Sequence, residues 1–342
     1  MSKTKLSLLI VSIISVFTLL AACGETSSEE GNASSSDVSG ELNFYTSQPD
    51  ADAEQLVSAF SEKYPDVEVS VFRSGTEEVI SKIQAEKEAG DVQADMLLVA
   101  DSVTFESLKE QDMLLEYKSD ETESIPENFV DPDGMYTGTK VMSTALVVNT
   151  ENVSEMPTSW NVLADAESSG QVIMPSPLYS GAAAYNLGVL TRNDNFGWEF
   201  YEDIQANDPM ITQGNGDVLK AVASGEKNYG MVVDFIVARA ATDGSPVELV
   251  YPEEGVPVIT EPIGIMKDTE NEAAAKAFVD FVLSQEGQEL AAEIGYTPIR
   301  EGVEAPEGLK TIEEMDVLEA DINELYQNRE QDKEQFNQLF GE

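Results

Sequence analysis

Two residue types that often carry chemistry are absent or nearly so. The chain of 342 residues has no histidine and a single cysteine, Cys23. Without histidine there is no Ser-His-Asp triad, no Cys-His pair and no His-ligated zinc. One cysteine forms no intramolecular disulfide, so the fold must rely on a hydrophobic core, which a chain of this length can bury. A hydrolase with two carboxylates as acid and base stays open as an alternative, although no pair of acids stands out.

Cationic residues are also scarce. Lys and Arg number 19 against 65 Asp and Glu, which gives a formal net charge of −46. Such a surface repels the phosphates of nucleic acids and of anionic lipids, so neither is expected as a partner. Excess carboxylate suits a protein that must stay hydrated in a saline or alkaline exterior.

The N-terminus has the order of a secretory signal. Lys3 and Lys5 precede an apolar run that ends in Leu20-Ala21-Ala22-Cys23. This ending resembles the lipobox of bacterial lipoproteins, which implies removal of residues 1–22, acylation of Cys23, and export to the outer face of the cytoplasmic membrane. Residues 23–40 are rich in Ser, Glu and Gly and predict a flexible tether. The alternative is a secreted protein with an incidental free thiol.

The periodicity of apolar residues predicts an α/β fold. Strands alternate with helices, which is typical of mostly parallel sheets flanked by helices, and the pattern occurs twice, which predicts two lobes. One helix is expected to begin at a capping box, Ser74-Gly75-Thr76-Glu77. The expected strands are 42–45, 67–71, 96–100, 171–174, 229–233 and 247–250. The expected helices are 52–64, one around 79–83, 182–190, 197–206, 217–224 and 235–242.

The remaining segments predict how the lobes are joined. Two extended stretches, 140–148 and 256–266, bracket the second lobe and have the composition of strands that cross between domains. Helices are expected at 272–284 and 286–294, followed by helical spacing through 311–340, and this last third is expected to pack back on the first lobe. The predicted boundaries are 41–140 and 263–342 for lobe 1, and 141–262 for lobe 2.

Four motifs follow this pattern: the leader with Cys23, the opening Leu42-Asn43-Phe44-Tyr45-Thr46-Ser47, the strand Gln93-Ala94-Asp95-Met96-Leu97-Leu98, and the closing segment 278–288 with Gly295-Tyr296-Thr297-Pro298-Ile299-Arg300. Together they resemble the extracellular solute-binding proteins of ABC importers, in the branch of ferric-iron, thiamine, phosphonate and sugar-phosphate binders. The resemblance implies a type II periplasmic-binding-protein fold, with two lobes that close over a solute. It also implies a monomer without enzymatic activity or cofactor.

The same resemblance implies two protein partners, a membrane permease and its ATPase subunit. The chain itself has no Gly-x4-Gly-Lys-Ser/Thr phosphate loop, so the energy for transport must come from another subunit.

Small polar loops after the first-lobe strands are candidates for solute binding. In open parallel sheets, ligands bind beyond the carboxyl ends of the strands, where helix N-termini present free N–H groups. Arg73 is conspicuous among so few cations and is a candidate to bind an oxyanion. Helix capping by Ser74 and Thr76, and a surface ion pair for Arg73, are the competing interpretations. The candidates are Thr46, Ser47, Arg73, Ser74, Gly75, Thr76, Asp101 and Ser102.

The second lobe offers a comparable set. Backbone N–H groups at Ser180, Gly181 and Ala182 are expected to approach a ligand closely, since Gly181 lacks a side chain. An ordinary loop with Ser180 as N-cap is the alternative. Tyr185 either reaches the cleft or packs, Asn215 either donates to the ligand or belongs to a Gly-rich turn, and Asp234 either binds an amine or a metal or caps a helix.

These loops favour a small phosphonate or phosphorylated anion, because Ser, Thr and Gly loops with Arg73 supply donors. Ferric ion is the alternative, with Tyr179, Tyr185 and Tyr229 as its ligands, although the chain lacks the Tyr-Tyr pair of iron binders in this branch. Thiamine would need aromatic faces, whereas Trp160 and Trp198 lie in segments predicted as helix surface or core. The negative net charge opposes binding of an anion, but salt screens the repulsion from carboxylates that lie farther than about 8–10 Å away. Nearby hydrogen-bond donors are therefore expected to determine the binding.

Overall fold

The computed structural model describes residues 38–341, which fold around one continuous ten-stranded mixed sheet. Cys23 and the predicted leader lie outside the described residues, as does nearly all of the predicted tether. Val38 is already buried in the core and the first strand starts at Gly40, so the folded body begins slightly before residue 41.

The strand order is β2-β1-β3-β9-β4-β7-β5-β6, and β8 and β10 pair with β4 as well. Pairing is parallel in β2-β1-β3 and in β7-β5-β6, as predicted, but every pair that includes β4 or β9 is antiparallel. The strands are β1 (Gly40–Thr46), β2 (Val67–Arg73), β3 (Met96–Leu98), β4 (Thr137–Asn149), β5 (Val172–Pro175), β6 (Met210–Thr212), β7 (Tyr229–Val233), β8 (Val247–Val250), β9 (Val258–Ile265) and β10 (Thr297–Pro298).

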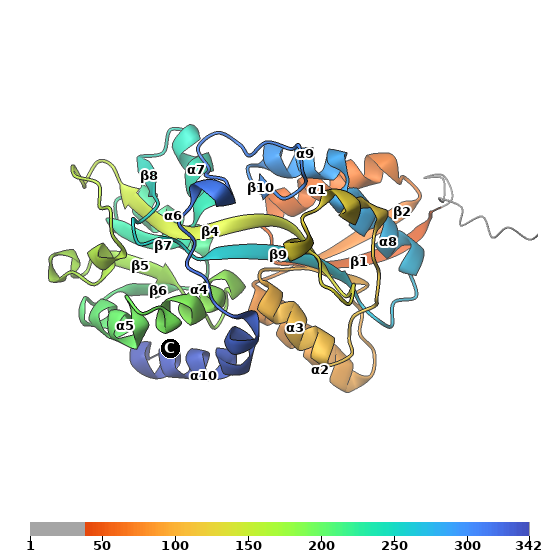
Figure 1. Ribbon diagram of the computed structural model, residues 1–342, viewed down its shortest axis with the longest axis horizontal. Coiled ribbons are helices and arrows are strands. Elements are labelled where there is room, and N and C mark those ends of the chain that lie inside the picture. Colours follow the sequence, from red (N-terminus) through yellow and green to blue (C-terminus); the bar gives the residue numbers. More distant parts are fainter. Residues whose placement is uncertain (1–37, 342) are drawn as a thin grey trace, which may run out of the picture.

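The helices cover both faces of this sheet (Figure 1). They are α1 (Asp50–Lys63), α2 (Thr76–Ala89), α3 (Ser102–Glu110), α4 (Gly181–Arg192), α5 (Gly197–Ala206), α6 (Asn215–Ala223), α7 (Asp234–Thr242), α8 (Glu272–Leu283), α9 (Gln285–Ile294) and α10 (Ile322–Phe340). Most helices predicted from periodicity are confirmed within a few residues, whereas α3 and the short β6 were not predicted. The helical spacing predicted through 311–340 is confirmed only from Ile322 onwards, because residues 311–321 contain a single 3-10 turn, Ile312–Glu314.

Strands β4 and β9 run through the middle of the molecule and link its two ends (Figure 1). They confirm that the stretches near 140–148 and 256–266 are extended strands. We call β1–β3 with α1–α3, α8 and α9 the first half, and β5–β8 with α4–α7 the second half. All thirteen residues of β4 are buried, as expected for a strand covered on both sides.

Each half has its own apolar core. In the first half, Phe44, Phe60 and Phe278 are fully buried, and the ring of Phe278 lies 5.0 Å from Phe44 and 4.7 Å from Phe60. In the second half, Trp160 is fully buried, and its indole Nε1 donates to the carbonyl oxygen of Gly255 at 2.8 Å. Large aromatic side chains such as these each bury a large apolar surface in their half.

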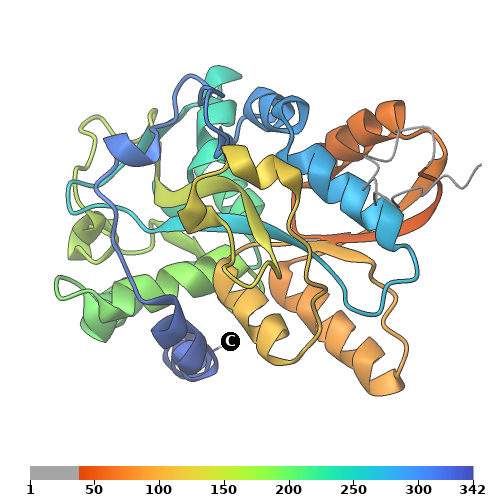
Figure 2. The same ribbon diagram turned by 45° about the vertical axis from the view of Figure 1, so that its right-hand side comes forward.

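The C-terminal helix α10 packs differently from the expectation that the last third returns to the first lobe. It contacts α4 and α5 of the second half as well as α3 of the first half (Figures 1 and 2). Leu325 and Phe336 are buried in the same cluster as Trp160, which explains this position. Helices α8 and α9 pack on the first half as predicted, whereas α10 lies across both halves.

Within residues 38–341, no helix combines the length and the apolar character needed to cross a bilayer.

Candidate functional site

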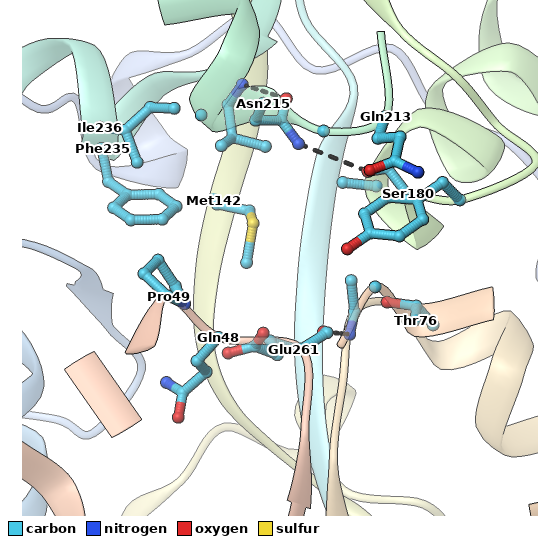
Figure 3. A pocket seen from close by; sticks show the side chains of 18 of the residues that line it. Gln48, Pro49, Thr76, Met142, Ser180, Gln213, Asn215, Phe235, Ile236 and Glu261 are labelled. Atoms are coloured by element: carbon cyan, nitrogen blue, oxygen red, sulfur yellow. Dashed lines mark hydrogen bonds between the residues drawn. The ribbon is translucent and has the colours of Figure 1, made fainter. Parts of the chain in front are cut away.

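A cavity of about 320 Å³ lies where the two halves meet (Figure 3). Its walls come from loops of both halves, and its floor comes from β4 and β9. The lining residues are Ser47, Gln48, Pro49, Arg73, Gly75, Thr76, Ala100, Met142, Tyr179, Ser180, Ala182, Gln213, Gly214, Asn215, Gly216, Asp217, Val233, Phe235, Ile236, Glu261 and Tyr296.

Five helices begin at this cavity. The N-cap residues of α1, α2, α4, α6 and α7 all line it; they are Pro49, Gly75, Ser180, Gly214 and Val233. The first turn of a helix has N–H groups without intrahelical acceptors, and the helix dipole places about half a positive charge there. Convergent N-termini therefore create a region of positive potential and free donors, although the whole chain is strongly acidic.

The start of α4 shows how the sequence positions these donors. The Ser180 hydroxyl accepts a hydrogen bond from the backbone N–H of Ala183 at 3.3 Å, so Ser180 is the N-cap. Ser180 therefore both caps α4 and lines the cavity, so the two interpretations do not exclude each other. The cap uses the Ala183 N–H and leaves the earlier N–H groups of the turn outside intrahelical bonding.

Arg73 lies at the end of β2 and is the one cation that lines the cavity within the described chain. Its Nε donates to the backbone oxygen of Gln48 at 2.8 Å, and the carboxylate of Asp50 lies 3.9 Å away. The guanidinium has five N–H donors, and this bond uses one. Arg73 therefore holds the Ser47–Pro49 loop in place and still has donors for an oxyanion.

Asn215 joins the loops of the second half. Its Nδ2 donates to the Ser180 hydroxyl at 3.4 Å, and its Oδ1 accepts from the backbone N–H of Val233 at 3.2 Å (Figure 3). One side chain thus fixes the starts of α4, α6 and α7 relative to one another.

The two halves touch along one side of the cavity. The Glu77 N–H donates to the backbone oxygen of Tyr179 at 3.3 Å. A Cβ atom on Gly75 would lie 2.6 Å from the Tyr179 ring, and one on Gly181 would lie 2.8 Å from the Thr76 hydroxyl. Glycine is therefore needed at both positions, because the loops approach too closely for any side chain. Gly181 serves this contact and does not line the cavity.

The cavity has a polar and an apolar side (Figure 3). Gln213, Ser180 and Thr76 lie on one side, and Pro49, Phe235 and Ile236 lie on the other. Met142 on β4 and Glu261 on β9 come from the two central strands.

Seven of the fourteen predicted binding residues line this cavity: Ser47, Arg73, Gly75, Thr76, Ser180, Ala182 and Asn215. Among the others, the Thr46 hydroxyl donates to the Leu98 carbonyl oxygen at 2.8 Å, and the Ser74 hydroxyl bonds the Glu78 carboxylate. The predicted capping box is wrong, because Gly75 is the N-cap of α2 and no side chain caps the helix.

Four more predicted residues do not line the cavity. Asp101 caps α3 by accepting from the Thr104 N–H at 3.0 Å, and Arg329 of α10 pairs with it at 2.9 Å. Ser102 is the first residue of α3, and Tyr185 packs against core clusters. Asp234 accepts from the hydroxyls of Ser143 at 2.7 Å and Tyr251 at 3.3 Å.

The tyrosines expected to ligate ferric ion do not converge. Tyr179 lines the cavity, but Tyr185 packs against apolar clusters and Tyr229 pairs with Val148 and Val172 in the sheet. The cavity's other tyrosine, Tyr296, donates its hydroxyl to Asp52 at 2.6 Å. Between residues 38 and 341, no cluster of three or more Asp, Glu or Cys side chains could hold a metal ion.

Several lining residues were not predicted, notably Met142, Phe235, Glu261 and Tyr296. Sequence signals existed for two of them. Glu261 is a charged residue inside an apolar strand, and Phe235 is the first residue of a predicted helix that follows a strand. The contribution of Met142 depends on strands β4 and β9 meeting from distant parts of the chain.

Comparison with known proteins places these features in context. The sequence model of a family described as "Bacterial extracellular solute-binding protein" matches residues 91–328. An uncharacterized protein of Haemophilus influenzae is 31% identical over 289 residues, which cover 81% of this chain and 81% of that protein.

Two solved structures share the fold. The periplasmic binding protein AfuA of Actinobacillus pleuropneumoniae, solved with fructose-6-phosphate, superposes with a TM-score of 0.81 and 24% identity, covering 88% of this chain and 98% of AfuA. Iron-bound HitA of Pseudomonas aeruginosa gives a TM-score of 0.76 and 22% identity, covering 86% of this chain and 99% of HitA. These matches confirm the predicted periplasmic-binding-protein fold.

Proposed function

Because the chain belongs to the family of bacterial extracellular solute-binding proteins, we propose that it captures a small phosphorylated or phosphonate-bearing anion in the cavity between its halves. The solute would then pass to a membrane permease whose ATPase subunit drives uptake. In this proposal the two halves act as lobes that close over the solute, with β4 and β9 as the crossing strands.

The observation that carries the proposal is the convergence of five helix N-caps on one cavity, with Arg73 beside them. Free N–H groups and helix dipoles bind tetrahedral oxyanions without a full counter-charge from the protein. Arg73 adds charged donors of the geometry that phosphate and phosphonate groups accept.

The size and the apolar wall of the cavity support an organic anion over a bare ion. The cavity volume of about 320 Å³ is roughly ten times the ~30 Å³ that one water molecule occupies in the liquid. A cavity of this volume has room for a solute larger than inorganic phosphate. Pro49, Phe235 and Ile236 would contact carbon atoms of the solute. Apolar walls with a few placed polar groups are typical of small-molecule sites.

Ferric ion remains the second candidate, supported by relatives named iron uptake proteins and by iron-bound HitA among the similar structures. Hard ferric ions need several anionic oxygen ligands. Tyr179 is a cavity tyrosine without a described hydroxyl partner, and Tyr185 and Tyr229 lie elsewhere. The arrangement of donors therefore favours the organic anion.

A thermal-shift panel on the purified protein tests the proposal. Inorganic phosphate, methylphosphonate, glycerol 3-phosphate, glucose 6-phosphate, ferric citrate and thiamine would be compared. A ligand at 100 times its Kd should stabilise the protein by about 2.7 kcal/mol, and we expect a phosphate ester or phosphonate to do so. Stabilisation by ferric salt alone, with a tyrosinate absorption band, would contradict the proposal.

Two variants locate the site. Arg73→Ala removes a charged donor and should weaken binding of the stabilising compound roughly tenfold or more. Ser180→Ala removes the α4 cap and should weaken it by a smaller factor. Ser224→Ala is the matched control, because Ser224 is exposed at the opposite end of α6. Unchanged affinity in both site variants would show that the solute binds elsewhere.

The family implies an exported protein, and we extend this to membrane attachment through Cys23. An acylated Cys23 followed by a slack tether at 23–40 would keep the binding body near the permease at high local concentration. Metabolic labelling with a radioactive fatty acid, compared between the natural chain and Cys23→Ala, tests the attachment.

A further inference from the structure

The cavity proposed to bind an anion contains a buried carboxylate, which has the same charge sign as the solute. Glu261 lies on β9 with 3% of its surface exposed, and it lines the cavity together with the exposed Asp217. Figure 3 shows its side chain across the cavity from Asn215. An uncompensated carboxylate here would repel the phosphate that the helix N-termini attract.

Lys140 compensates this charge from outside the cavity. It is the register partner of Glu261 on β4, the two side chains form an ion pair, and both are only 4% exposed. Lys140 lines a smaller neighbouring cavity with Gln48, Gln288 and Tyr296, and its Nζ lies 4.7 Å from the Tyr296 ring centre. The pair is neutral as a whole, and it presents its acceptor, not its ammonium group, to the solute.

The acceptor capacity of Glu261 is largely unused. A carboxylate offers about four lone-pair positions. The Lys140 ammonium contacts Oε2, which is buried. Within residues 38–341, no side-chain donor contacts the other carboxylate oxygen, Oε1. Polar atoms in native protein sites nearly always have a hydrogen-bond partner, so a donor on the solute would supply the missing partner of Oε1.

We infer that Glu261 accepts a hydrogen bond from a hydroxyl group of the solute, so that the ligand is a hydroxylated phosphate ester or phosphonate. This inference rests on the proposed function and specifies its substrate class. A hydroxyl fits better than an ammonium group, because Lys140 already supplies the positive charge that the carboxylate needs. The C–H groups of such a solute would lie against Met142 and Phe235 on the apolar side.

Matched ligands that differ only in hydroxyl groups test the inference. Titration calorimetry would compare glycerol 3-phosphate with propyl phosphate, and glucose 6-phosphate with (tetrahydropyran-2-yl)methyl phosphate. A hydrogen bond to a buried charged acceptor gives roughly 10- to 100-fold in affinity, so at least one hydroxylated member should bind tighter than its partner by that factor.

A variant that tests Glu261 must also remove the charge of Lys140, so that no unpaired charge stays buried below the cavity. Glu261→Met alone would leave Lys140 buried and unpaired, so it is combined with Lys140→Met. This double variant should bring the affinity ratio of each ligand pair towards one. Lys140→Met with Glu261→Gln keeps an acceptor oxygen and should retain part of the preference. This second variant also serves if the first does not fold. Glu248→Gln, on the exposed side of β8, is the control and should keep the wild-type ratio.

The outcomes separate the two proposals. If the wild-type protein binds phosphate esters without preferring hydroxylated ones, the role of Glu261 is wrong and the proposed function stands. If the double variant keeps the full preference, another residue is the acceptor. If no phosphate or phosphonate compound binds, the proposed function and this inference fail together.

Discussion

Asp234 is a buried carboxylate at the start of α7, one residue before Phe235 of the cavity wall. Burial raises its pKa to about 6, although hydrogen bonds from Ser143, Phe235 and Tyr251 favour the ionised form. An unfolded aspartate has a pKa of about 3.9, so between these values the folded state binds more protons than the unfolded state. The contribution of Asp234 to the free energy of unfolding therefore decreases as the pH rises from about 4 to 6, and is constant above that range.

Asp234→Asn removes this titration. We expect the unfolding free energy of the variant to rise relative to wild type by about 2 to 3 kcal/mol between pH 4 and pH 7. Urea unfolding at pH 4, 5, 6, 7 and 8 measures the difference. Asp243→Asn, at the exposed end of the same helix, controls for the loss of one carboxylate. A difference that does not change with pH would show that the pKa of Asp234 is not raised.

At the scale of elements, α10 ties the two halves together. Arg329 pairs with Asp101 of α3's N-cap at 2.9 Å and with Glu77 of α2 at 2.8 Å, and Lys333 also contacts Glu77 at 2.8 Å. The other face of α10 packs on α4, where Arg192 pairs with Asp332 at 2.7 Å. Burial raises the pKa of Glu77, but Arg329 and Lys333 outweigh that effect and hold it below its usual range.

Replacing Arg329 by Met should destabilise the protein strongly. The change leaves Asp101 buried with a net charge and no counter-ion, which costs about 3–5 kcal/mol. Adding Asp101→Asn should recover part of this loss, because the residual charge disappears. Urea unfolding of both variants measures the effect. Lys276→Met breaks a helical surface pair with Glu272 and should change stability by less than about 1 kcal/mol. If Arg329→Met behaves like that control, the ion pairs of α10 contribute little.

The same helix shows where prediction from sequence ends. Local periodicity was enough to predict most strands and helices, because the spacing of their apolar residues can be recognised over a few neighbouring positions. Examples are Leu42 and Phe44 on β1, and Phe278 and Val282 on α8. Leu325 and Phe336 gave α10 its apolar face but could not identify α4 as its partner. That choice depends on close packing at Gly188, where a Cβ atom would lie 2.7 Å from Leu325.

For the candidate site, too, the sequence predicted local features but not contacts between distant parts of the chain. Loops at the carboxyl ends of parallel strands were foreseeable, and Arg73, Ser180 and Asn215 do line the cavity. Asp101 looked like one of them, but Arg329, 228 residues away in the chain, pairs with it. Met142 was missed for the same reason, since the pairing of β4 with β9 brings it near Glu261 only in the folded protein.

At the scale of the whole molecule, net charge should govern stability. A chain with a formal charge of −46 repels itself in the folded state, and added salt shortens the range of this repulsion from about 10 Å at 0.1 M to about 3 Å at 1 M. Surface ion pairs weaken under the same screening, but each is worth at most about 1 kcal/mol. Because acidic residues exceed basic ones more than threefold, most carboxylates have no cationic partner, and the loss of repulsion should dominate.

We therefore expect sodium chloride to stabilise the protein. Between 0.05 and 1 M, the Tm at pH 7.5 should rise by at least about 4 °C, which corresponds to about 2 kcal/mol for a domain of this size. Sucrose, which stabilises proteins by exclusion from their surface and without screening, separates the two effects. The salt-induced rise should shrink at pH 4.5, where part of the carboxylates are protonated, whereas the effect of sucrose should not. A Tm that falls with salt would mean that ion pairs such as those of Arg329 outweigh the repulsion, and that the acidic surface does not limit stability.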